Sequence, residues 1–241
     1  MAMTVLVVSA VTYMPKIVSV STNVGGRDMP IYSVETEKPQ IALSFDTSWG
    51  NEDISDILSV LAKNDVKASF FLTGHWVKLY PDDVKAIQAA GHDLGNHGEN
   101  YEDMTRLADR EKTSELMNLH NEVKNLTGVD MNLFRAPFGA YDNAVIQNAA
   151  ENGYYTVQWS VDSLDWKDYG ANAISEAVCD SENLDDGAII LLHNGTKYTA
   201  QVLDEVIATL KSKGYEFVPI SQLIYKENYQ IDQKGKQRDN M

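Results

Sequence analysis

Residues 41–46 read IALSFD, and residues 54–62, a few positions later, read ISDILSVLA. The first stretch is a short apolar run of the kind that forms a buried strand. In the second, apolar residues recur at intervals of three and four, which places them on one face of a helix. A buried strand followed by an amphipathic helix is the repeating unit of a parallel α/β protein.

The same alternation continues to about residue 218 and gives some seven strand–helix units, which predicts a parallel (β/α) barrel or a doubly wound sheet. No G-x-G-x-x-G or P-loop sequence follows a strand, so a nucleotide-binding fold loses its main support. Strands are expected at 41–45, 66–72, 91–96, 133–134, 154–161, 188–193 and 216–218. Helices are expected at 54–62, from 81 onward, around 116–126, and at 142–152, 171–180 and 198–213.

The composition is that of an ordinary globular protein with a strong negative charge. The chain has 241 residues, 44% of them hydrophobic, and a formal net charge of −15. A single barrel takes about 250 residues, so one large core is expected. The charge argues against a nucleic-acid partner and against adhesion to an anionic membrane surface. Cys179 is the only cysteine, which excludes an intrachain disulfide and a cysteine-based zinc site.

Three regions are expected along the chain. Residues 1–39 form a leader, residues 40–225 the main domain, and residues 226–241 a polar tail that should fray. Within the leader, residues 4–13 are apolar but shorter than the roughly 20 residues of a membrane span. They are interpreted either as a strand of the domain or as the remnant of an export signal or anchor.

Ionisable residues recur where the predicted strands end. Catalytic residues of a barrel gather at the C-terminal ends of its strands. Each position alone has an ordinary explanation as a helix cap or a satisfied core residue. Five strand ends that carry such groups together predict a functional site. These residues are Asp46, His97, Arg135, the pair Asp162 and Asp165, and His193.

The segments around these residues resemble, in order and spacing, the five motifs of polysaccharide deacetylases, carbohydrate esterase family 4. The resemblance covers about residues 40–224. It implies a distorted (β/α) barrel that hydrolyses an acetyl group, usually an N-acetyl group on a sugar. The segments are SFDTSWG (44–50), GNH (95–97), RAPFG (135–139), DSLDW (162–166) and LLH (191–193).

The resemblance also implies catalytic roles. Asp46 is similar to the general base that takes a proton from the attacking water, and Arg135 beside it would keep the carboxylate ionised. His193 is similar to the general acid that protonates the leaving amine. Asp162 is similar to the residue that hydrogen-bonds this histidine and favours its charged form.

Substrate contacts follow from the same comparison. The backbone N–H of Phe138 would stabilise the oxyanion. Trp166 and Leu191 are similar to the apolar walls of the acetyl pocket, with core packing as the alternative for Trp166. Tyr141 and Trp49 flank motif positions, and their rings could stack on sugars.

The metal-binding part of the motifs departs from the usual pattern. Of three expected ligands to a divalent metal, normally zinc, only His97 is present. Thr47 and Tyr101 occupy the other two positions, and their neutral hydroxyls are poor ligands. Three outcomes stay open: a rearranged set of Asp46, His97 and Glu99 holds the metal, the chemistry runs without metal, or hydrolysis is lost and glycan binding kept. Outside such a set, Glu99 is expected to be a solvated loop charge.

The sequence therefore predicts a hydrolase that removes acetyl groups from N-acetylated sugars, with peptidoglycan N-acetylglucosamine as the favoured substrate. The alternative is a weakened or inactive homologue that binds cell-wall glycan. An unrelated glycosidase would need a carboxylate pair such as Asp46 with Asp162 or Asp165. It leaves the RAPFG and LLH segments without a role. A cell-wall substrate implies an exported or cell-surface protein.

Overall fold

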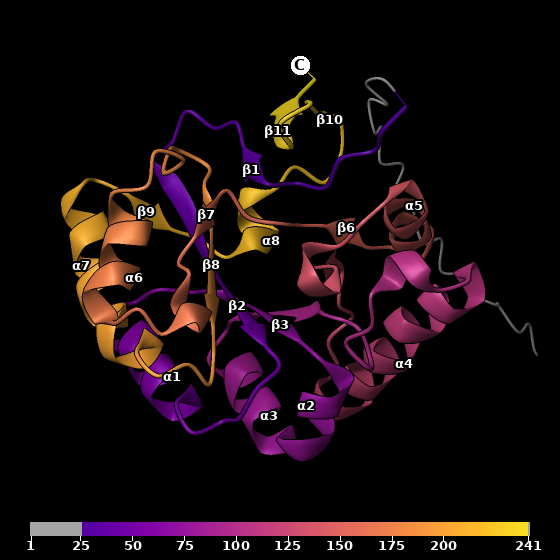
Figure 1. Ribbon diagram of the computed structural model, residues 1–241, viewed down its shortest axis with the longest axis horizontal. Coiled ribbons are helices and arrows are strands. Elements are labelled where there is room, and N and C mark those ends of the chain that lie inside the picture. The colour runs from indigo at the N-terminus through magenta and orange to yellow at the C-terminus, as the bar shows by residue number, and fades with distance from the viewer. Residues whose placement is uncertain (1–25, 241) are drawn as a thin grey trace, which may run out of the picture.

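The computed structural model describes residues 26–240, and at its centre lies a curled sheet of parallel strands (Figure 1). The strand order is β6-β5-β4-β3-β2-β8-β7, and β9 pairs with the start of β2. Because neighbouring strands are parallel, their carboxyl ends lie along one edge of the sheet. The strands are β2 (Gln40–Thr47), β3 (Ser69–Leu72), β4 (Asp93–Asn96), β5 (Leu133–Phe134), β6 (Tyr155–Thr156), β7 (Val161–Asp162), β8 (Ile189–His193) and β9 (Glu216–Phe217).

The barrel is open on one side. Among the described residues, β6 and β7 end the row of paired strands and do not pair with each other. Ile31 bridges to Val157 beside β6, and Ser33 bridges to Ala188 before β8, so the segment that contains them crosses the open side. This arrangement confirms the predicted distorted (β/α) barrel of about seven units.

The helices other than α8 form a ring outside the sheet, and α8 lies inside it; β1 (Ser33–Val34) lies at the gap in that ring (Figure 1). Every predicted helix is present, and α2 and α8 are additional. Thr73 starts α2, because its hydroxyl accepts a hydrogen bond from the Trp76 N–H. The helices are α1 (Ile54–Lys63), α2 (Gly74–Leu79), α3 (Pro81–Ala89), α4 (Asp109–Thr127), α5 (Asn143–Glu151), α6 (Ala171–Cys179), α7 (Thr199–Ser212) and α8 (Ile220–Leu223).

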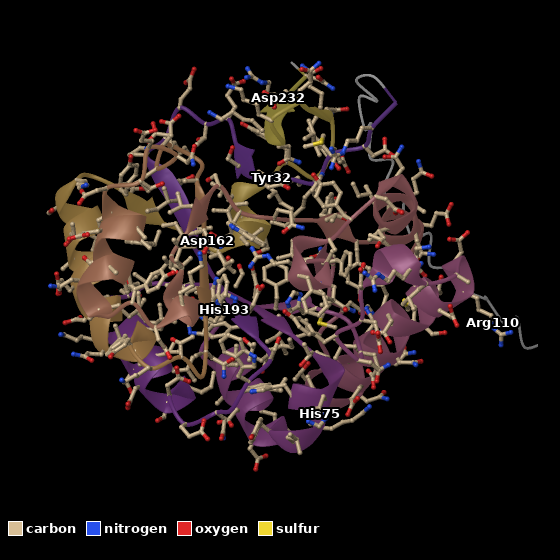
Figure 2. The ribbon with its side chains drawn as sticks, viewed as in Figure 1. Tyr32, His75, Arg110, Asp162, His193 and Asp232 are labelled. Atoms are coloured by element: carbon tan, nitrogen blue, oxygen red, sulfur yellow. The ribbon has the colours of Figure 1, made fainter. Side chains whose placement is uncertain are left out.

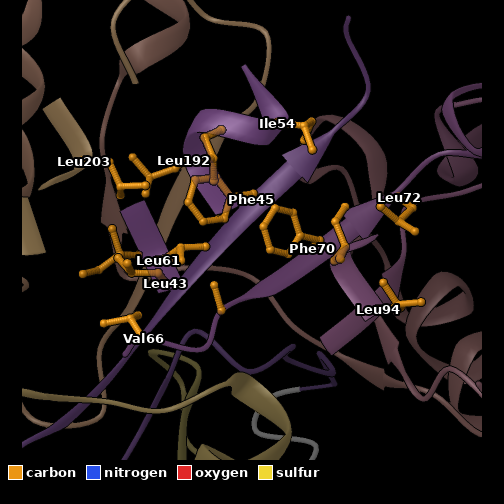
Figure 3. Close-up of a cluster of buried hydrophobic side chains, with 14 of the residues drawn as sticks. Leu43, Phe45, Ile54, Leu61, Val66, Phe70, Leu72, Leu94, Leu192 and Leu203 are labelled. Carbon is orange, nitrogen blue, oxygen red and sulfur yellow. The ribbon is translucent and has the colours of Figure 1, made fainter. Parts of the chain in front are cut away.

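The side chains of β2 point alternately to the two faces of the sheet, so one set packs in the core and the other lies in the site. Leu43 and Phe45 point toward the helices, where Phe45 stacks on Phe70 with ring centroids 4.9 Å apart (Figure 3). Successive side chains of a strand point to opposite faces. Ser44 and Asp46 therefore face the inside of the barrel, and the apolar side chains that hold β2 also fix the direction of its polar ones.

Residues 229–239 form an ordered hairpin, so the expectation that residues 226–241 fray is wrong for the described part, 226–240. β10 (Tyr229–Ile231) pairs antiparallel with β11 (Lys236–Asp239), and β11 pairs in parallel with β1. Both end residues of β10 are buried against the side chains that fill the barrel. The buried Gln237 amide bonds the backbone of Tyr225 through both its oxygen and its nitrogen. Within residues 226–240, the two apolar side chains at the ends of β10 hold this polar segment against the barrel. Two apolar residues are too few for the composition of the segment to predict an ordered structure.

The described part of the leader also belongs to the fold, through hydrogen bonds of Gly26 and Asp28 to α5 and through the bridges that cross the open side of the barrel. The interpretations of residues 4–13 lie outside the described residues. No helix in residues 26–240 is both long enough and apolar enough to cross a membrane.

Candidate active site

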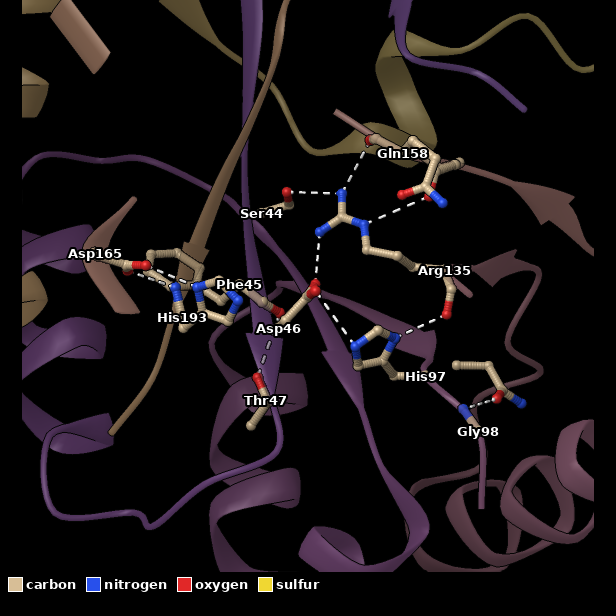
Figure 4. A network of polar contacts seen from close by, with 12 residues as sticks. Ser44, Phe45, Asp46, Thr47, His97, Gly98, Arg135, Gln158, Asp165 and His193 are labelled. Atoms are coloured by element: carbon tan, nitrogen blue, oxygen red, sulfur yellow. Dashed lines mark hydrogen bonds and ion pairs between the residues drawn. The ribbon is translucent and has the colours of Figure 1, made fainter. Parts of the chain in front are cut away.

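The predicted site residues meet at the carboxyl edge of the sheet (Figure 4). Asp46 on β2 lies directly opposite His193 on β8 in the strand register. His97 follows β4 and Arg135 follows β5. Figure 4 shows Asp46 at the centre of the network, between His193 on one side and His97 on the other. The sequence therefore predicted correctly which residues come together here, although their catalytic roles stay predictions.

Arg135 is completely buried, and all three of its guanidinium nitrogens donate hydrogen bonds. Its Nη1 donates to Asp46 Oδ1 at 2.6 Å, and its Nη2 donates to Ser44 Oγ at 2.9 Å and to the Gln158 carbonyl at 3.1 Å. The guanidinium also lies 4.1 Å from the centroid of the Phe71 ring. A planar group with this many fixed partners holds the Asp46 carboxylate in one orientation.

Asp46 is ionised in this environment. Burial raises the pKa of its carboxyl, but the charge of Arg135 and the contacts with His97 and His193 outweigh burial and lower the pKa well below its usual value. A base must be deprotonated at working pH, and this carboxylate remains so even in acidic solution.

His97 presents one free nitrogen to Asp46. Its Nδ1 lies 2.8 Å from the Arg135 carbonyl, which can only accept, so Nδ1 carries a proton. Its Nε2 is buried, lies 3.3 Å from Asp46 Oδ2 and has no partner in hydrogen-bond geometry. A lone pair on this nitrogen is repelled by the carboxylate, whereas a cation between the two atoms would be attracted to both.

The partner of His193 is Asp165, and the prediction that Asp162 fills this position is wrong. His193 Nδ1 lies 2.7 Å from Asp165 Oδ1, and the His193 backbone N–H donates to Asp165 Oδ2 at 2.8 Å. The Asp162 carboxylate instead accepts the N–H of Leu164, two residues later, at 2.9 Å. Asp side chains commonly close such local turns. Asp162 and His193 both lie inside the ring of helices (Figure 2).

The charged form of His193 is favoured. Burial lowers the pKa of the imidazole, but the hydrogen bond to Asp165 and the charges of Asp46, Asp165 and Asp162 outweigh it and raise the pKa. Asp165 is itself held by the Thr199 hydroxyl at 2.7 Å. The site thus pairs an ionised carboxylate with an imidazolium.

The expected metal site has too few side chains that can ligate a metal ion. The Thr47 hydroxyl bonds to the Phe45 carbonyl at 3.4 Å. The ring of Tyr101 lies 5.1 Å from that of His97. Burial and the charge of Asp46 raise the pKa of the Tyr101 phenol, so it stays neutral and ligates poorly. Between residues 26 and 240 no three His, Cys, Asp or Glu side chains are grouped so as to hold a metal ion.

Glu99 does not complete the set. Its side chain is buried and pairs with Lys78, so the expectation of a solvated charge is wrong. Its backbone N–H bonds the Glu115 carbonyl, which fixes it in the loop after β4. With Asp46 and His97 as the only donors, the residues do not fit a zinc site that has three protein ligands.

Strained backbone surrounds the site. Tyr101, Phe138 and Leu164 have φ values of 59°, 60° and 55°, a left-handed conformation that disfavours side chains. Each costs on the order of 1–3 kcal/mol and persists only where surrounding packing imposes it. The rings of Tyr101 and Phe138 are in contact, with centroids 4.5 Å apart.

The predicted substrate residues have different surroundings. Trp166 is 51% exposed, which rules out core packing as its role. Leu191 is buried on β8 opposite Ser44, on the inner face that also carries His193. The Phe138 side chain is 64% exposed. Tyr141 bonds the Tyr32 hydroxyl at 3.2 Å, a contact that favours packing against the leader over sugar stacking.

The sequence model of the family described as polysaccharide deacetylase matches residues 33–157, just over half of the chain. The chain belongs to this family. The prediction from the five motifs is thereby confirmed, and so is the fold expected from it. Polysaccharide deacetylases of this class generally depend on a metal.

Several characterised and uncharacterised members are similar in sequence. The uncharacterized protein YlxY of Bacillus subtilis is 35% identical over 81% of this chain and 60% of its own length. The peptidoglycan-N-acetylmuramic acid deacetylase PdaA of Bacillus subtilis is 34% identical over 83% of this chain and 77% of its own length. The peptidoglycan-N-acetylglucosamine deacetylase PgdA of Listeria monocytogenes is 34% identical, and the chain spans only 47% of it.

Solved structures show the same polysaccharide deacetylase fold. A family 4 pseudoenzyme from Bacillus anthracis has a TM-score of 0.78 and 32% identity over 82% of this chain and 69% of its own. A mutant of that pseudoenzyme with restored enzymatic activity is equally similar, with a TM-score of 0.78. The PdaA structure from Bacillus subtilis has a TM-score of 0.76 and 33% identity over 80% of this chain and 84% of its own.

The sequence did not predict the role of Asp165 as the partner of His193, and it did not predict Ser44 as a site residue. The sequence places both Asp162 and Asp165 after the same strand. Two aspartates three residues apart do not reveal which of them bonds to His193. Ser44 accepts from Arg135 and donates to the Ile190 carbonyl at 2.8 Å. A polar residue inside an apolar strand, two positions before Asp46 and so on the same face, was the signal for it.

We predict that Asp165→Asn lowers the pKa of His193 and that Asp162→Asn lowers it less. The first change removes the hydrogen bond to the imidazolium, and the second removes only a nearby charge. An NMR titration of the His193 ring measures both. Since the folded pKa is raised, the charge of His193 stabilises the fold fully below about pH 6.5 and this contribution is lost as pH rises through the folded pKa. Equal shifts in the two variants would contradict the assignment.

Proposed function

We propose that this chain is a hydrolase that removes acetyl groups from N-acetylated sugars of a polysaccharide, with N-acetylglucosamine of peptidoglycan as the substrate. The observation that carries the proposal is the pair formed by Asp46 and His193, which lie opposite each other with opposite charges. The names of PdaA and PgdA support the choice of an N-acetylated peptidoglycan sugar.

The first chemical step uses Asp46. The carboxylate takes a proton from a water molecule, and the water oxygen bonds to the acetyl carbonyl carbon. The electron pair of the carbonyl bond moves to oxygen, which takes over the hydrogen bond that the Phe138 N–H donates to the Tyr101 phenol in the structure. Loss of one such donor typically lowers the rate about 10²–10³-fold. Arg135 keeps the carboxylate oriented and ionised before the step.

The second step uses His193. The oxyanion re-forms the carbonyl, the bond between carbon and nitrogen breaks, and its electron pair takes the proton of the His193 imidazolium. The products are acetic acid, which loses its proton to solvent to give acetate, and the free amine of the sugar. Asp165 holds the imidazole ring throughout. The proton on Asp46 then returns through solvent to His193, which restores both charges. General acid–base catalysis contributes about 10²–10⁴-fold.

No step is assigned to a metal. Zinc, the ion that the resemblance favours, would find the Asp46 carboxylate and His97 Nε2 and no third protein ligand. Two protein donors give weaker binding than the three of catalytic zinc sites. The chemistry proposed for this chain therefore depends on its own acid, base and oxyanion donor, and a low rate is expected.

A second candidate is an inactive homologue that binds cell-wall glycan. Thr47 and Tyr101 at the ligand positions favour it, and so does the similarity to the Bacillus anthracis pseudoenzyme. The intact network around Asp46, Arg135, Asp165 and His193 favours the hydrolase, because a binder needs neither a poised base nor a poised acid. In either case the ligand is an N-acetylated glycan, and we propose an exported or cell-surface location to match it.

We predict that the chain releases acetate from N-acetylglucosamine oligomers and that Asp46→Asn lowers the rate at least 10²-fold, since the base is lost. Chelator should change the rate little. Because Asp46→Asn leaves Arg135 without its partner, a thermal melt of each variant controls for folding, and His193→Gln provides an independent test of the chemistry. Binding of the oligomers without any acetate release would support the inactive homologue.

We also predict that the double variant Thr47→Asp, Tyr101→His becomes metal-dependent. It places a carboxylate and an imidazole at the two deficient positions beside His97, which completes three protein ligands. Zinc should then raise the rate of acetate release by several-fold or more, and chelator should abolish the gain. The matched control is Thr47→Asp alone, which supplies one ligand. Equal zinc response in wild type and double variant would mean that the present residues already form a metal site.

A further inference from the structure

Trp49 lies directly beside the proposed general acid. Its ring stacks on the imidazole of His193, with centroids 5.4 Å apart and an angle of 17° between the planes. The side chain is nevertheless 47% exposed, so only part of the indole is covered. A single exposed tryptophan on a protein surface needs no explanation. Trp49, however, stacks on the imidazole of the proposed general acid, so the exposed part of its indole is an apolar surface next to the place where the leaving group must lie.

The backbone next to Trp49 is held from two sides. The Gly50 carbonyl accepts a hydrogen bond from Trp76 Nε1 at 3.0 Å and another from the Asn194 amide. Both donor residues are buried. The backbone beside Trp49 is therefore hydrogen-bonded both to α2 and to Asn194, the residue after His193. These two contacts hold the position of Trp49.

The backbone of Gly195 lies close to Trp49 and supports it further. Gly195 has a φ of 72°, and a Cβ added there would lie 2.9 Å from the Cβ of Trp49. The N–H of Gly195 is held by both carboxylate oxygens of Asp53 at 2.9 Å. The loops after β2 and β8 thus pack together around Trp49. A ring that is supported in this way loses little conformational entropy when a ligand covers it.

We propose that Trp49 is the platform for the sugar ring whose nitrogen His193 protonates. This inference rests on the glycan ligand of the proposed function. The leaving nitrogen must lie within hydrogen-bond reach of His193, so the pyranose ring that carries it lies beside the stacked indole. The apolar C–H face of a pyranose packs on an aromatic face, and the indole face also attracts the imidazolium. Trp49 thereby fixes the nitrogen relative to the acid.

The test is binding of the N-acetylglucosamine tetramer, measured by calorimetry and by tryptophan fluorescence. Trp49→Ala and Trp49→Leu should weaken binding about tenfold or more, and Trp49→Phe should recover most of the affinity because it keeps an aromatic face. The tetramer should change the fluorescence of wild type and of Tyr169→Phe, the matched variant at an exposed aromatic residue outside the predicted site, and should lose most of this effect in Trp49→Phe. Unchanged thermal melts exclude misfolding.

Three further outcomes separate this inference from the proposed function. Tetramer affinity in Trp49→Ala equal to that of wild type would overturn the platform, whether or not acetate is released. Weaker binding in Trp49→Ala by a chain that releases no acetate would support the platform and overturn the hydrolase. No tetramer binding by wild type would overturn the platform as stated. A second readout is the pKa of His193 by NMR, which should fall in Trp49→Ala and recover in Trp49→Phe.

Discussion

The buried ion pair between Arg135 and Asp46 is the constraint on which the rest of the site depends. Taking two charges out of water costs several kcal/mol per ion, and only close geometry with further hydrogen bonds offsets it. Here Ser44, the Gln158 carbonyl and the ring of Phe71 supply the additional contacts. The same guanidinium that keeps Asp46 charged also fixes its direction, while the Arg135 carbonyl orients His97. One residue after β5 therefore organises groups from β2 and β4.

The two halves of the site have kept different amounts of the family pattern. The acid–base half is complete, with Asp46 opposite His193 and Asp165 behind the imidazole. In the metal half, His97 faces Asp46 across 3.3 Å without a third ligand, and Tyr101 covers the imidazole. The chain is similar both to named deacetylases and to a pseudoenzyme. In the proposed reaction, the chemistry falls to groups whose charges are set by burial and by neighbouring residues.

Sequence patterns predicted the barrel and the meeting of Asp46, His97, Arg135 and His193, because strand periodicity and strand ends are local properties. These patterns gave wrong predictions where two similar side chains could fill the same position, and where a residue distant in the sequence determines the surroundings of a side chain. Asp162 was preferred over Asp165, but a local turn captures its carboxylate. Glu99 reads as a loop charge, and Lys78 on α2 makes it a buried partner. The sequence of residues 226–241 is polar and predicts a frayed tail, whereas pairing with β1 orders Lys236–Asp239 within it.

The most direct test of this account is the pH dependence of kcat/KM for acetate release from the N-acetylglucosamine tetramer. The pKa of Asp46 is lowered from about 3.9 and that of His193 is raised from about 6.5. Acid and base are then both in their working forms from about pH 4 to beyond 6.5, so a plateau over this range with a fall only on the alkaline side is expected. A rate that instead rises with pH between 6 and 8, as for a metal-bound water with a pKa of about 7, would contradict the account.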